Sequence, residues 1–213
     1  MNNPTTQTYS SLTTAYDLFN KELFSGNLPP CLITMQRHKG AFGFFCGERF
    51  TNNEEITDEI ALNPVHLSRK TDEVLSTLAH EMVHLWQHHF AKPPRKSYHD
   101  KQWANKMLEI GLIPTATGEI NGKKTGQKMT HLIEENGRYA QAVARLLQEH
   151  PAILYHDRMT DDNGIRQKKS ASKTKYTCPI CDLNAWAKPE SRFVCSDCQE
   201  LMQSSQGDAD QSG

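Results

Sequence analysis

The chain has 213 residues, with 24 Lys and Arg against 25 Asp and Glu, and a formal net charge of -1 when histidine is neutral. Because the charges balance, no global field draws the protein to nucleic acid or to a membrane, and any such attraction must come from a local patch. No stretch approaches the roughly 18 consecutive apolar residues of a membrane span, and residues 1–10 lack the pattern of a secretory signal. We therefore expect a cytoplasmic protein without a membrane partner.

Apolar residues recur at steps of three and four in several segments, the spacing typical of amphipathic helices. The segment that begins with Thr71-Asp72-Glu73 has the broadest apolar face, and we expect it to be central to the core. Gly111 stands at the position favoured after a helix end. The pattern predicts helices over about 8–24, 71–90, 99–110 and 138–148.

Between the first two helices, three short runs have strand character, at about 31–35, 41–47 and 59–63. A small antiparallel sheet is the simplest interpretation. Gly43 and Gly47 interrupt the middle run; we interpret them as ordinary turn glycines, with a bulge or a close backbone approach as the alternative. Residues 115–130 are rich in Thr, Gly and Lys and indicate a loop.

The length suits one domain of about 150 residues with a small appendage. Residues 156–173 form a basic segment with too few apolar side chains to pack, which indicates a linker. The polar residues 203–213 have no hydrophobic anchor, so we expect a disordered tail. The predicted organisation is a main domain over 8–155, the linker, a four-cysteine module over 174–202, and the tail.

The predicted helix 71–90 contains His80-Glu81-Met82-Val83-His84. Residues four apart lie on the same helix face, so the two imidazoles can converge on one metal ion while Glu81 lies beside them. A carboxylate in that place can take a proton from a zinc-bound water, which then attacks a carbonyl carbon. The alternative is that both histidines belong to an ordinary helix surface, since a short motif also arises by chance.

A catalytic zinc takes a third protein ligand and leaves one position for water. His88 lies on the same helix face but about 6 Å beyond His84, and His89 points sideways. His99 follows a proline-containing turn and opens the next helix, so it can approach from outside the first helix. We prefer His99 as the third ligand and keep Glu109 as the second choice. Tyr98 and His131 are candidates for stabilising the oxyanion.

Two CxxC pairs stand near the C-terminus: Cys178 with Cys181, and Cys195 with Cys198. In a reducing compartment this spacing is typical of a four-cysteine structural zinc site. A segment of about 25 residues cannot bury enough core to fold alone, so the metal would supply the missing stability.

Aromatic and basic residues accompany these cysteines. Tyr176, Phe193 and Trp186 could pack the hairpin or stack on single-stranded nucleic acid, and packing is the preferred interpretation in so small a module. The basic side chains permit phosphate contacts, although a charge run is usually only solvated. The candidate nucleic-acid contacts are Lys173, Lys175, Trp186, Lys188 and Arg192.

Two stretches together resemble the SprT family and its eukaryotic relative Spartan: the motif from His80 to His84, and His99-Asp100-Lys101-Gln102-Trp103, a later histidine followed by an aromatic residue. The run from Phe19 to Pro29 and Ile60-Ala61-Leu62-Asn63-Pro64 also look like the family's opening helix and the strand before its motif helix. One departure is Asp100, where the family commonly has glycine.

The resemblance implies a minimal zincin-like α+β domain, with helices around a small antiparallel sheet, and the cysteine spacing adds a C-terminal four-cysteine zinc ribbon. The resemblance also implies three histidine ligands and a glutamate base. Together with the four-cysteine site, this predicts two zinc ions per chain, one catalytic and one structural. In Spartan-like members the substrates are proteins crosslinked to DNA. The leading hypothesis is thus a zinc endopeptidase acting on protein substrates, with single-stranded DNA as a further partner. The rival is a non-catalytic nucleic-acid-associated adaptor or transcription-related regulator; the sequence leaves the oligomeric state open.

Overall fold

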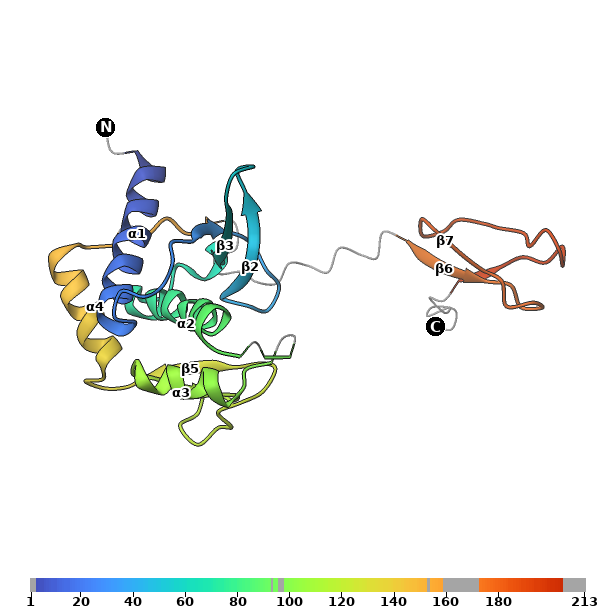
Figure 1. Ribbon diagram of the computed structural model, residues 1–213. Coiled ribbons are helices and arrows are strands. Elements are labelled where there is room, and N and C mark those ends of the chain that lie inside the picture. Colours follow the sequence, from blue (N-terminus) through green and yellow to red (C-terminus); the bar gives the residue numbers. More distant parts are fainter. Residues whose placement is uncertain (1–2, 93, 96–97, 153, 159–172, 205–213) are drawn as a thin grey trace, which may run out of the picture. The chain divides into compact units, whose positions relative to one another are not determined.

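The computed structural model describes residues 3–92, 94–95, 98–152, 154–158 and 173–204 (Figure 1). The chain divides into two compact units, Met1–Asp161 and Asp162–Gly213. Most of the predicted linker, residues 159–172, and the predicted tail from residue 205 onward lie outside the described residues. No helix in the described ranges is both long and apolar enough to cross a bilayer.

The first unit is organised around α2 (Thr71–Phe90), which matches the predicted helix at both ends. This helix contacts α1 (Pro4–Leu23), α3 (Lys101–Glu109), α4 (Arg138–Glu149) and two strands of a sheet (Figure 1). Asp72 and Glu73 lie in its first turn, where negative charge favours a helix start. Its buried residues include His80 and Glu81, so packing on several sides holds the motif in place.

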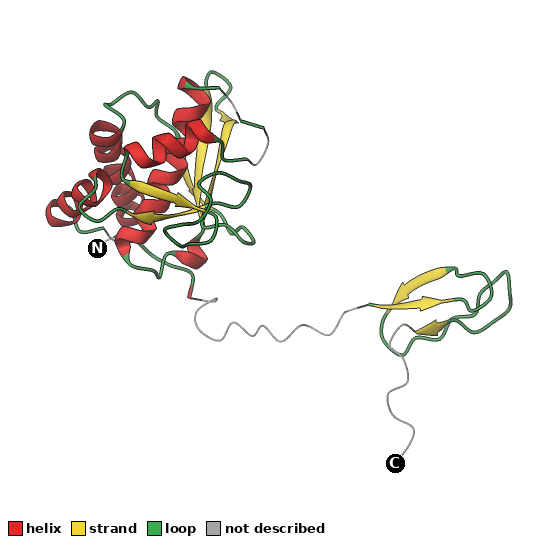
Figure 2. Ribbon diagram, turned by 90° about the horizontal axis from the view of Figure 1, so that it is seen from below, coloured by secondary structure: helices red, strands yellow, loops and turns green. Residues whose placement is uncertain are grey.

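A three-stranded sheet covers part of α2, with β1 (Leu32–Met35), β2 (Gly43–Thr51) and β3 (Ile56–Leu62) in the order β1-β3-β2 (Figure 2). The prediction of an antiparallel sheet is wrong for one of its two pairs, because β1 runs parallel to β3. The strands β2 and β3 form the antiparallel hairpin. The sheet is mixed because β3 inserts between β1 and β2, which are consecutive in sequence but not neighbours in space.

Neither glycine of the middle run is a turn glycine, since Gly43 and Gly47 both lie within β2. A Cβ on Gly43 would lie 2.8 Å from the Ala61 carbonyl oxygen and 3.3 Å from Cγ of Glu81. The register shifts between Cys46 and Phe50, which marks a bulge. The alternative interpretation, a bulge with close backbone approach, is therefore the correct one.

Two strands fall at the ends of the segment predicted as loop: β4 (Leu112–Thr115) and β5 (Thr130–Ile133), which pair antiparallel. Each has only four residues, too few for a clear alternating pattern. The sequence analysis predicted neither strand, and this matters for the site because β5 carries His131.

The core of the first unit is completed by α1 and α4, which pack side by side (Figure 1). The rings of Phe19 and Tyr139 lie 5.4 Å apart, and both side chains are fully buried. The Tyr139 hydroxyl donates to the backbone oxygen of Asp72 (2.6 Å). The last helix thus reaches back to the first turn of α2.

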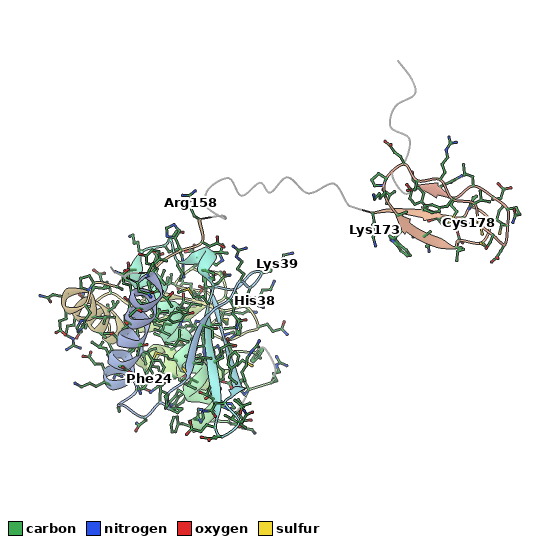
Figure 3. The ribbon with its side chains drawn as sticks, turned by 90° about the horizontal axis from the view of Figure 1, so that it is seen from above. Phe24, His38, Lys39, Arg158, Lys173 and Cys178 are labelled. Carbon is green, nitrogen blue, oxygen red and sulfur yellow. The ribbon has the colours of Figure 1, made fainter. Side chains whose placement is uncertain are left out.

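The second unit is a small sheet of β6 (Thr174–Thr177), β7 (Asn184–Ala187) and β8 (Gln203–Ser204), in the order β7-β6-β8. Lys173 precedes this sheet and Cys178 follows its first strand (Figure 3). Gln203 and Ser204 were expected in the disordered tail, yet they pair with Thr177 and Tyr176. The ordered module therefore extends two residues beyond the predicted end.

Candidate metal centres

Three histidines converge on one face of α2. His80 and His84 come from the helix, and His99 comes from the segment just before α3. One potential ligand atom from each ring lies within 4.8 Å of the other two, close enough for a single ion to contact all three. Burial is the main cause that lowers the pKa of each ring, to about 3 for His84. The rings are therefore neutral at neutral pH, the form that offers a lone pair to a metal.

A hydrogen-bond chain determines which nitrogen His80 presents. The Ser76 hydroxyl donates to the Glu73 carbonyl (2.8 Å), so its oxygen accepts from Nε2 of His131 (2.7 Å). Nδ1 of His131 is then left with a lone pair, and it accepts from Nδ1 of His80 (3.0 Å). The lone pair of His80 consequently lies on Nε2, the nitrogen that is free for a metal.

His99 is oriented by the loop that precedes β5. Its backbone N–H donates to the Gly126 carbonyl (2.8 Å) and its carbonyl accepts from the Gly126 N–H (3.0 Å). The same Gly126 carbonyl lies 3.1 Å from Nδ1 of His99. Since a carbonyl only accepts, Nδ1 carries the proton and Nε2 is left as the donor atom for a metal.

Trp103 packs against all three rings. Its side chain is fully buried, with centroid distances of 5.0 Å to His80, 5.5 Å to His84 and 4.4 Å to His99. The residue before α3, Asp100, caps the helix by accepting from the Trp103 N–H (3.0 Å) and also accepts from the Gln87 amide (2.9 Å). The departure from the family's glycine thus provides a cap and a link to α2.

Glu81 lies beside the histidine cluster and is 5% exposed. Burial raises the pKa of its carboxyl group to about 8. The β2 backbone passes over this side chain at Gly43. A cation held by the three histidines would favour the ionised carboxylate and oppose the effect of burial. The donor set and the neighbouring carboxylate fit a zinc ion with one open position.

Other candidates lie elsewhere. Glu109, the second choice for the third ligand, is 55% exposed and pairs with Lys106 (2.7 Å). His88 and His89 lie close to Asp58. Both ring nitrogens of His131 are engaged, by His80 and Ser76, so the oxyanion role considered for His131 does not fit this arrangement. The guanidinium of Arg95 lies over the ring of Tyr98, with 4.0 Å between Cζ of Arg95 and the ring centroid.

The four paired cysteines form the second cluster, and one sulfur atom from each lies within 4.8 Å of the others. All four are free thiols, and the Sγ atoms of Cys181 and Cys195 are 3.7 Å apart. Four sulfurs around a tetrahedral zinc at about 2.3 Å have this kind of spacing. The two turns repeat each other, because Asp182 and Gln199, each four residues after a cysteine, have φ values of 58° and 56°. This cluster fits a structural zinc site.

The five candidate nucleic-acid contacts, Lys173, Lys175, Trp186, Lys188 and Arg192, are all exposed. Trp186 is 61% exposed, so the preferred interpretation as a packing residue is wrong for it. Packing does hold for the other two aromatic residues: Tyr176 is buried, and Phe193 lies against it at 5.2 Å. Lys175 is the cross-strand partner of Trp186. Lys173, Lys188 and Arg192 are also at the surface.

Fold and site together define an α+β protein with a histidine cluster suited to a metal and a separate four-cysteine cluster. The model of the SprT-like family matches residues 12–131, more than half of the chain, and this protein belongs to that family. The chain is also 50% identical over 62 residues to a Salmonella typhimurium protein described as "Uncharacterized protein in mucB 3'region", covering 28% of this chain and 84% of that relative. No solved structure matches the chain.

Proposed function

We propose that this protein is a zinc-dependent endopeptidase with a zincin-like fold, in which His80, His84 and His99 hold the metal. The observation that carries the proposal is the convergence of three imidazole donor atoms within 4.8 Å next to the buried carboxylate of Glu81. Membership of the SprT-like family supports the same class of chemistry. A scaffold without activity has no evident use for a buried carboxylate at this position.

A zinc ion bound there would lower the pKa of a water molecule and polarise the scissile peptide carbonyl. Glu81 accepts the proton of the attacking water and returns it to the departing amine nitrogen. Hydrogen bonds from His80 to His131 and from His99 to Gly126 hold the rings in the tautomers that face the metal. The buried ring of Trp103 packs against all three imidazoles and limits their rotation.

The test compares the parent protein with Glu81→Gln in casein cleavage and self-cleavage, with and without single-stranded DNA. Glutamine keeps the shape of the side chain but cannot accept the proton, so we expect activity to fall at least 100-fold. Zinc content should be unchanged, and a His80→Ala, His84→Ala double variant should lose one ion. Equal activity of Glu81→Gln and the parent would refute the mechanism.

We further propose that the four-cysteine module binds single-stranded DNA and brings the peptidase to DNA-associated or DNA-crosslinked proteins. The exposed indole of Trp186 beside Lys175 supports this, since stacking and phosphate contacts together are typical of single-strand binding. The rival function, a non-catalytic adaptor, uses the same surface without cleavage.

DNA binding is tested by fluorescence titration with a labelled oligonucleotide at two salt concentrations. Trp186→Ala and Lys175→Ala should each weaken binding, and the lysine variant should also reduce the salt dependence. The control is Leu201→Ala, another exposed apolar residue of the same unit. Binding that is insensitive to Trp186 and Lys175 would exclude this surface. DNA binding by a parent protein that cleaves neither casein nor itself would favour the adaptor.

A further inference from the structure

A second group of metal-binding side chains lies outside the histidine site of the first unit. It comprises Asp58 of β3 with His88 and His89 at the C-terminal end of α2. One ligand atom from each lies within 4.8 Å of the other two. Nε2 of His89 is 2.6 Å from Oδ2 of Asp58, and Nε2 of His88 is 3.9 Å from Oδ1. The two rings thus face opposite oxygens of one carboxylate.

The β2 bulge builds this arrangement. Oδ1 of Asp58 accepts from the backbone N–H of Glu48 (2.8 Å), a residue with a φ of 52°. A Cβ on the preceding Gly47 would lie 2.8 to 3.2 Å from three atoms of the His88 ring. The bulge therefore orients the carboxylate, and the glycine leaves the space that the His88 ring occupies.

We propose that Asp58, His88 and His89 form a second cation site in this unit, selective for zinc and similar divalent transition metals. Two imidazole nitrogens and one carboxylate oxygen suit zinc, whereas magnesium and calcium prefer oxygen ligands alone. The Asp58 side chain is 6% exposed, while those of His88 and His89 are 34% and 35% exposed. The carboxylate is thus fixed within the fold, and water can reach the ion to complete its coordination.

An ion pair explains only part of this geometry. A proton shared by His89 and Asp58 accounts for the 2.6 Å contact, but the 3.9 Å between His88 and the same carboxylate is too long for a hydrogen bond. A cation that replaces this proton would be bound by both imidazole rings and by the carboxylate. The site is independent of the proposed peptidase activity, since His88 lies one helical turn, about 6 Å, beyond His84.

Two properties follow. Because its histidines are half-exposed and must be ordered on binding, this site should be weaker than the enclosed site of His80, His84 and His99. An ion here would also join the end of α2 to the β2–β3 hairpin, and should raise the melting temperature by mass action.

The experiment measures zinc per chain after equilibrium dialysis against buffered zinc of rising free concentration. We expect two ions at low free zinc and a third at higher concentration. His88→Ala, His89→Ala should abolish only the third, whereas His80→Ala, His84→Ala should remove one of the first two. The matched control is His38→Ala, His150→Ala, which removes two exposed histidines elsewhere and should still bind three.

Asp58→Asn tests the site without removing a ring. The amide keeps an oxygen to accept from Glu48 but loses the negative charge, so the third ion should bind at least 10-fold more weakly with the circular dichroism spectrum unchanged. Magnesium at the same concentrations should not raise the melting temperature. The proposal is overturned if the parent saturates at two ions, or if the third ion binds equally well to the double variant and to Asp58→Asn.

Discussion

The tautomer of His80 depends on a hydrogen bond to a residue far away in sequence. His131 follows His80 by 51 positions and belongs to a strand that sequence patterns did not indicate. Burial lowers the pKa of His131 to about 4, with a smaller contribution from Arg69, so the ring is neutral and its Nδ1 can accept. The sequence motif predicted that His80, His84 and His99 share one site, but it carried no signal for the residue that orients His80.

His131→Ala should therefore weaken zinc binding at the histidine site by about 10- to 100-fold, the usual effect of losing a partner that orients a ligand. Ser76→Ala, which removes the far end of the hydrogen-bond chain, should have a smaller effect in the same direction. Competition with a chromogenic chelator measures both, and His150→Ala serves as the control. Unchanged affinity in His131→Ala would show that this hydrogen bond does not position His80.

Asp100→Ala should reduce the free energy of unfolding of the first unit by about 1 to 2 kcal/mol, because α3 loses its N-cap and Gln87 loses its partner. Asp100→Asn should be nearly neutral, since one amide oxygen can accept both bonds as Oδ1 of Asp100 does. Urea unfolding monitored by circular dichroism measures the free energy of unfolding of both variants. Equal losses in both variants would contradict a capping role.

Elements with long periodic patterns were predictable, and short ones were not. The ends of α2 were predicted at the observed residues, because a 20-residue amphipathic segment gives a strong signal. The four-residue strands β4 and β5 and the parallel pairing of β1 with β3 were missed. Pairing direction depends on which strand inserts between two others, and no local pattern records that.

At the level of the β2 strand, Gly43→Ala should lower both stability and activity. The added Cβ would meet the Ala61 carbonyl at 2.8 Å and the side chains of Thr77 and Glu81 at 3.1 and 3.3 Å. Crowding of this kind costs about 1 to 3 kcal/mol, and it displaces the strand or the glutamate. Thermal unfolding and casein cleavage measure the two effects.

Gly118→Ala serves as a control that separates the loss of stability from the loss of activity expected for Gly43→Ala. Gly118 has open space around it but a φ of 81°, so the alanine costs stability by about 1 kcal/mol without reaching the site. The Gly118→Ala variant should unfold at a lower temperature than the parent, but it should cleave casein at the parent's rate below its melting temperature. If Gly43→Ala also keeps full activity, the close approach of β2 to Glu81 has no catalytic importance.

For the whole molecule, the two units differ in what holds them together. The buried hydrophobic cluster of the first unit includes residues from α1, α2, α3 and α4. Among the described residues of the second unit, the corresponding cluster is Tyr176, Cys178, Cys195 and Met202. We therefore expect the second unit to need a metal ion bound by its four cysteines in order to fold. Doubled CxxC spacing made this contrast predictable from the sequence, but the participation of Gln203 and Ser204 was not.

Chelation of zinc in the full chain should therefore unfold the second unit and leave the first folded. Limited proteolysis after treatment with a strong chelator should cleave within 173–204 and spare 4–158. Cys178→Ser with Cys181→Ser should give the same pattern without chelator. Protection of both units after complete removal of zinc would refute a structural role for the four cysteines.

The hydrogen bond from Tyr139 to Asp72 affects where the chain can be truncated without loss of the fold. The family match ends at His131, eight residues before this tyrosine. A fragment designed on that boundary would keep every ligand of the histidine site and still lack α4. It would leave Phe19 without its ring partner and open the apolar face of α1 to solvent. Shortened versions for crystallisation or expression should retain α4 to its end at Glu149, because without it the protein would be prone to aggregate.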